Sequence, residues 1–162
     1  MTSIVTASAS ADATTAGTEL ADRLAETLDG QAPALVFVFA STQQPLEGLL
    51  PPIVQRFPNA TVLSASTAGE FTEQEVSKGA AVAAAIAGDF EVRSGMGTAL
   101  AANAEQAVSA ALTEIPDAVD GFPHRTAVML LDPLSGNGER SADRLLGVRR
   151  QRGAHPRSHL EV

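Results

Sequence analysis

The stretch T-V-L-S-A-S-T-A-G-E-F-T-E-Q-E-V-S-K, residues 61–78, decides the fold. It begins with a short apolar segment at residues 61–65, which has the length and the β-branched content of a buried strand. The segment then ends in two hydroxyl groups, a glycine and a carboxyl group, which belong to Ser66, Thr67, Gly69 and Glu70. Ligands of open α/β sheets collect at the carboxyl ends of strands, so this end is a candidate binding site. Ser and Thr at a strand end also bond their own backbone in ordinary turns, and that interpretation stays open.

Two other predicted strands end in a similar way. Ala34 to Ala40 is a continuous apolar run, typical of a strand buried on both faces, and Ser41 and Thr42 follow it. Arg125 to Leu131 is the other. Its end at residues 132–138 contains Asp132 and Ser135, although glycine loops before helices are common without any ligand, and a plain loop is the favoured interpretation of that segment. We expect one shared ligand site formed by Ser41, Thr42, Ser66, Thr67, Gly69, Glu70, Asp132 and Ser135.

The first half of the chain alternates predicted strands and helices. A weak strand signal at residues 3–8 precedes a helix at Ala13 to Leu28, whose apolar residues recur every four positions. A second helix begins after Pro45, and we expect Pro51 and Pro52 to shorten or distort it. Strands that alternate with helices predict parallel neighbours joined by right-handed crossovers.

The pattern changes after residue 78. Residues 79–87 and 90–97, joined by Gly88 and Asp89, predict a β-hairpin, although the alanine-rich first arm could also be a helix. A helix at residues 99–114 capped by Thr98 follows, and a last helix begins at Ser141. The fold class we expect is α/β: a mixed β-sheet with parallel central strands and one hairpin, with helices packed against it.

Composition excludes several classes of function. The 162 residues carry a net charge of −8, which argues against nucleic acid or an anionic membrane as the main partner. The chain has no Cys, so thiolate catalysis and Cys-based metal sites are excluded. It lacks a membrane span and an export signal, so we expect a cytoplasmic protein. Pro156 between His155 and His159 argues against a metal site there. No G-x-S-x-G surrounds any Ser, and we expect no enzyme activity.

The ordered set of segments resembles the N-terminal FIST domain, a sensory module of bacterial signalling proteins that also occurs in some F-box proteins. The resemblance rests on S-T-A-G-E after a strand, V-F-V-F-A-S-T at residues 36–42, and a helix at residues 46–58 that includes the start of R-F-P-N-A. It implies small-ligand sensing, with amino acids as proposed ligands, and a signalling protein or domain as partner. Some family members resemble haem-binding nitric-oxide sensors. His124 would be the axial candidate here, but we expect a surface histidine and no cofactor.

The resemblance covers roughly residues 3 to 147, and we expect residues 1–147 to form a partial FIST-like domain. Residues 148–162 hold four Arg and two His against one Glu, with no apolar period. We interpret this basic tail as a non-native end that truncates the family's fold, or as a disordered native tail. The alternative function is a protein-interaction or assembly module without a small ligand. A sheet edge left open by the missing half would favour a homodimer.

Overall fold

The computed structural model describes residues 2–9, 13–72, 76–77 and 79–144. The basic tail and its predicted disorder therefore lie outside the described residues. The chain divides into two units, Met1–Val92 and Arg93–Val162, and each is described by itself.

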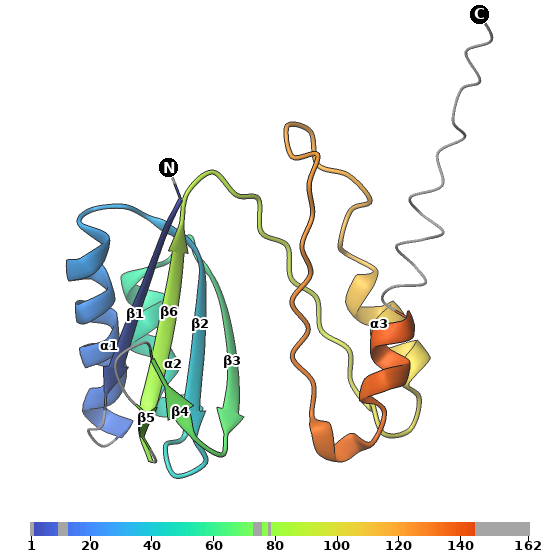
Figure 1. Ribbon diagram of the computed structural model, residues 1–162, viewed down its shortest axis with the longest axis horizontal. Coiled ribbons are helices and arrows are strands. Elements are labelled where there is room, and N and C mark those ends of the chain that lie inside the picture. Colours follow the sequence, from blue (N-terminus) through green and yellow to red (C-terminus); the bar gives the residue numbers. More distant parts are fainter. Residues whose placement is uncertain (1, 10–12, 73–75, 78, 145–162) are drawn as a thin grey trace, which may run out of the picture. The chain divides into compact units, whose positions relative to one another are not determined.

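A four-stranded mixed sheet organises the N-terminal unit, with the strand order β1-β6-β2-β3 (Figure 1). The strands are β1 (Ser3–Ala9), β2 (Pro33–Ser41), β3 (Thr61–Thr67) and β6 (Ala81–Ala87). β2 and β3 are parallel, whereas β6 runs antiparallel to both β1 and β2. The predicted α/β class and mixed sheet are confirmed, and the parallel pair consists of the central strand β2 and the edge strand β3.

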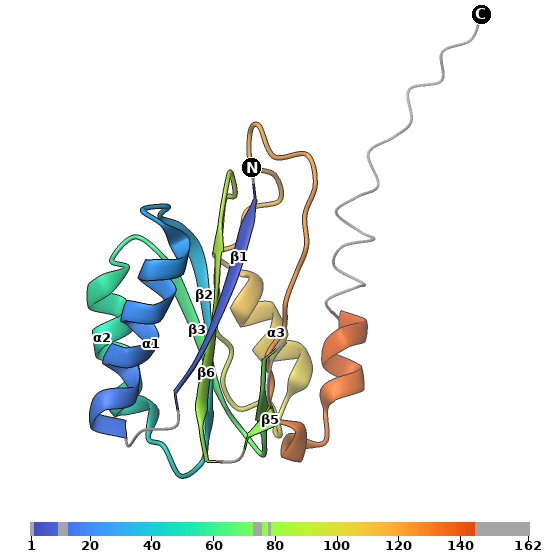
Figure 2. The same ribbon diagram turned by 60° about the vertical axis from the view of Figure 1, so that its left-hand side comes forward.

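Two helices, α1 (Ala13–Leu28) and α2 (Leu46–Arg56), cover the same face of this sheet (Figures 1 and 2). β1, β2 and β6 bury alternate side chains under them, as a strand's period of two predicts, whereas the side chains of the edge strand β3 are at most half-buried. In β2 these side chains are Val36, Val38 and Ala40. The predicted helical stripe supplies the other layer, and its four members are fully buried or nearly so: Ala16, Leu20, Leu24 and Leu28.

α2 continues through Pro51 and Pro52, which the sequence predicted would shorten or distort it. The two prolines remove the backbone donors that would reach the carbonyls of Glu47 and Gly48. Both of those residues are exposed, so water can bond the freed carbonyls. On the buried side, Leu49 and Ile53 hold the helix against the core.

The hairpin lies earlier in the chain than the sequence predicted. Residues 81–87 form a strand, but residues 90–97 form none, because β6 is a central strand whose two neighbours are β1 and β2. The antiparallel pair that does occur consists of β4 (Glu70–Phe71) and β5 (Val76–Ser77). β4 contacts β2 and β6, close to the carboxyl end of β2 (Figure 1).

The C-terminal unit contains α3 (Ala104–Leu112), the 3-10 turn η1 (Pro133–Ser135) and a helical segment at residues 138–144. α3 begins later than predicted, because Asn103 caps it by accepting a hydrogen bond from the Gln106 N–H, and Thr98 does not.

The buried strand predicted at residues 125–131 is wrong. This segment joins no β-ladder, and Val128 and Leu130 are 57% and 41% exposed. An apolar run becomes a buried strand only where neighbouring strands supply backbone partners and cover its faces. The described residues of the C-terminal unit supply no such strands.

Candidate functional site

The carboxyl end of β2 turns sharply at Ser41, which is 8% exposed. The Ser41 N–H donates to the carbonyl of Ala80 at 3.0 Å, which ties this end to the start of β6. The Ser41 hydroxyl accepts a hydrogen bond from the Gln43 N–H at 3.3 Å. The Ser41 carbonyl accepts one from the Gln44 N–H at 2.8 Å. This turn directs the Gln44 side chain back toward the strand that follows Gly79.

Gln44 is 6% exposed and its amide group is only half satisfied. The Gln44 Nε2 donates to the carbonyl of Gly79 at 2.6 Å. No described residue donates to its Oε1 atom, which is buried. Gln44 is not among the site residues predicted from the sequence. The available signal was a polar residue directly before the helix-starting Pro45, three residues beyond a buried strand.

The carboxyl end of β3 holds a second buried acceptor. Glu70 is 2% exposed, and the Thr67 hydroxyl donates to its Oε1 atom at 2.6 Å. The same hydroxyl lies 3.3 Å from the Ala40 carbonyl, so the single Thr67 proton favours the shorter contact. The Oε2 atom of Glu70 is buried and accepts no hydrogen bond from the described residues.

The carboxyl ends of β2 and β3 therefore carry a buried polar cluster, which we define as Ser41, Gln44, Thr67 and Glu70. The parallel register pairs Ser41 with Thr67, so the two strands end side by side. Glu70 begins β4, which contacts β2 and β6. Burial of an acceptor without a donor costs about 1–3 kcal/mol, and more for a charged group. Two such acceptors in one buried cluster are a feature that a bound donor would relieve.

Three other predicted residues of this end, Thr42, Ser66 and Gly69, are exposed. Ser66 and Thr67 point to opposite faces, since neighbouring side chains alternate along a strand. Gly69 has open space where a Cβ atom would lie, so nothing in the structure requires a glycine there.

The last two predicted site residues, Asp132 and Ser135, belong to the C-terminal unit. Asp132 caps the 3-10 turn, because its Oδ1 atom accepts a hydrogen bond from the Leu134 N–H at 2.9 Å. The Ser135 hydroxyl is buried and has no hydrogen-bond partner among the described residues. These contacts match a local turn, and a role of either residue in ligand binding stays a prediction.

The described residues contain no group of three or more His, Asp or Glu side chains that could hold a metal ion. His124 is exposed, and His155 and His159 lie outside the described residues. Within the part of the chain that is described, no helix has both the length and the apolar character that crossing a membrane demands.

Two hollows of the N-terminal unit are lined by residues other than the four of the buried polar cluster. One adjoins the amino end of β2. The other lies between β1 and α1, and Thr72, two residues after Glu70, also lines it.

Comparison with known proteins gives one family match. No characterised protein and no solved structure shows significant similarity to the chain. Residues 34–151 match the FIST N domain, and this match includes β2 from its second residue, β3 and the whole buried polar cluster. The family consists of sensory domains in signal transduction. Since the match spans most of the sequence, this chain belongs to the FIST N domain family.

Proposed function

We propose that this chain is a non-catalytic sensory module that binds a small amine-bearing metabolite, such as an amino acid, at the buried polar cluster. The observation that supports the proposal is the pair of acceptors without described donors, Glu70 Oε2 and Gln44 Oε1. A protonated amine carries three donors and a positive charge, which match a carboxylate and an amide oxygen. The exposed hydroxyl groups of Thr42 and Ser66, or free backbone N–H groups, would hold the ligand's carboxylate.

Ligand binding would act on a signalling partner through the strand ends. A ligand shifts a conformational equilibrium only by its difference in affinity for two states. β4 contacts both β2 and β6, so an amine bound to Glu70 would draw the ends of three strands together. The partner's identity, and the cytoplasmic location expected from the sequence, stay predictions.

Thermal denaturation with a panel of amino acids and simple amines tests the proposal. A ligand at 100 times its Kd stabilises the protein by about 2.7 kcal/mol, which raises the Tm by roughly 5–10 °C for a chain of this size. Glu70→Gln should remove this response. Glu47→Gln, which changes an exposed glutamate on α2, should keep it.

Lys78 provides the competing explanation, because it is the chain's only lysine and lies eight residues after Glu70 in the sequence, outside the described residues. If Lys78 neutralises Glu70, Lys78→Gln should destabilise the free protein, and only this variant, not the native protein, should be stabilised by added amines. Our proposal expects the native protein to respond and Lys78→Gln to respond at least as strongly. A native protein that no amine stabilises would count against the ligand.

A second function has one observation in its favour, the edge of β3 that pairs with no other described strand. β3 lies at the end of the strand order, and residues 61–67 contain no charged side chain and no proline. Such an edge is a template for pairing with another strand, which fits an assembly module or a homodimer. Light scattering after size exclusion separates the two functions, since a dimer indifferent to amines supports assembly. Thr61→Lys should then give monomers.

A further inference from the structure

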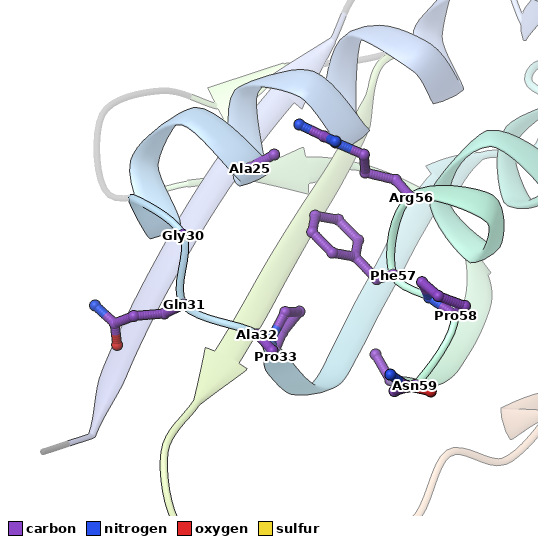
Figure 3. A pocket seen from close by; sticks show the side chains of 10 residues that line it. Ala25, Gly30, Gln31, Ala32, Pro33, Arg56, Phe57, Pro58 and Asn59 are labelled. Atoms are coloured by element: carbon purple, nitrogen blue, oxygen red, sulfur yellow. The ribbon is translucent and has the colours of Figure 1, made fainter.

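One of the two hollows lies at the opposite end of β2 from the buried polar cluster, where α1 and α2 both end (Figure 3). Its volume is about 280 Å³, which is near the lower limit of small-ligand pockets. Every residue around it belongs to the N-terminal unit. The hollow is therefore a candidate site that the proposed function does not use.

The backbone around this hollow is already hydrogen-bonded. After α1 the chain turns through the left-handed region at Asp29 and Gly30, where φ is 47° and 81°. This turn lets the Gln31 N–H donate to the carbonyl of Leu28 at 2.9 Å. At the end of α2, the Phe57 N–H donates to the carbonyl of Ile53 at 3.0 Å. The walls are thus formed without a ligand.

Arg56 is the charged residue that lines the hollow. It has no hydrogen bond or ion pair with any described residue, whereas Arg23 of the same unit pairs with Glu19 and donates to the carbonyl of Ser8. Figure 3 shows the Arg56 and Phe57 side chains reaching from the end of α2 toward Ala25 on α1. Phe57 is 8% exposed and lines the hollow with its ring, beside the exposed side chain of Arg56.

We propose that this hollow binds a small carboxylic acid with an apolar or aromatic body. The Arg56 guanidinium matches a carboxylate through two parallel hydrogen bonds. The body of the ligand would lie against the Phe57 ring, with Ala25 and Pro33 as further apolar lining. The two helix ends carry about half a negative charge each and oppose an anion. This opposition is reduced because some of the last carbonyls of both helices already accept hydrogen bonds, and the full positive charge of Arg56 outweighs the remaining partial charges.

An NMR titration of the whole chain with benzoate tests this site, with benzamide as the neutral probe and benzamidine as the cation of the same shape. A probe this small should bind with a Kd of about millimolar order. The amide signals of Gln31, Ala32 and Ala60 should shift with benzoate. Arg56→Gln should weaken binding by roughly 10-fold or more. Arg140→Gln, an exposed arginine of the other unit, should leave it unchanged.

Three outcomes would overturn the proposal: no shifts at tens of millimolar benzoate, equal binding to the Arg56→Gln variant, or tighter binding of benzamidine than of benzoate. Tighter benzamidine binding would mean that the helix ends, and not Arg56, determine the charge preference. Glu70→Gln should leave benzoate binding intact. The proposals of an amine site and of a carboxylic acid site can therefore be refuted independently of each other.

Discussion

Thr67→Val isolates the hydrogen bond on which the buried polar cluster depends. Valine keeps the β-branched shape of threonine and its fit to a strand, but it removes the only described donor to the Glu70 carboxyl group. Both carboxyl oxygens would then be buried without a described donor. The parallel pairing of β2 and β3 uses backbone atoms and should persist.

The magnitude follows from two opposed terms. A hydrogen bond to a charged group contributes about 1.5–3 kcal/mol, and the contact at 2.6 Å is short. A buried methyl group in place of the hydroxyl returns up to about 0.8 kcal/mol. The expected net loss is about 1–2 kcal/mol in the free energy of unfolding, or roughly 2–8 °C in Tm.

Urea unfolding of four proteins measures this coupling: the native chain, Thr67→Val, Glu70→Gln and the double variant. We expect an interaction free energy of about 1 kcal/mol or more between the two sites. Thr67→Ser should stay close to the native chain because it retains the hydroxyl. Thr61→Val, at the other end of β3, removes a half-buried hydroxyl that bonds no described side chain. If Thr67→Val costs no more than Thr61→Val, Glu70 does not depend on Thr67 and our description of the cluster is refuted.

Two further predictions concern packing and loop anchoring. Gly17→Ala should lower the free energy of unfolding by about 1–2 kcal/mol in denaturant, although alanine favours a helix, because its Cβ would lie 2.5 Å from the Leu49 carbonyl oxygen. Gly69→Ala is the control, since nothing lies within 4 Å of its added Cβ, and it should change this free energy by less than about 0.5 kcal/mol. Equal effects of the two variants would contradict the close approach of α1 and α2. Asn137→Ala should lower the local stability of residues 138–144 by about 1–2 kcal/mol, measured by hydrogen exchange, because the Asn137 Nδ2 donates to the carbonyls of Leu100 and Ala101 at 3.0 and 3.2 Å. Asn137→Asp, which lacks this donor, should lower it at least as much. Native-like hydrogen exchange in the Asp variant would disprove the anchoring.

The regular elements of the N-terminal unit could be predicted because their signals are local. The apolar residues spaced four apart at residues 13–28 gave a helix with the predicted ends, and the continuous run at residues 34–40 gave β2. The partner of residues 79–87 could not be predicted locally. β6 pairs with β1 and β2, which lie far away in sequence, and not with the segment that follows its turn.

The candidate site, too, could be predicted from the sequence only in part. Sequence spacing predicted that hydroxyl and carboxyl groups follow the strands. In the structure Ser41 ends β2 and Thr67 ends β3, while Glu70 begins β4; Ser41 and Glu70 are buried and Thr67 is half-buried. It did not reveal that Thr42 and Ser66 are exposed, or that Gln44 is buried with its carbonyl oxygen lacking a described donor. Residue type says what a side chain can bond, but not which of its atoms are enclosed.

The sequence by itself therefore determined the alternation of strands and helices and the apolar stripe of the core, because each depends on the spacing of neighbours along one chain segment. Only the tertiary structure decided where Glu70 is enclosed, where Arg56 is left without a described counter-ion, and why Gly17 must stay small. Those properties depend on which atoms of distant segments meet, and long-range contact is set by packing and not by local pattern.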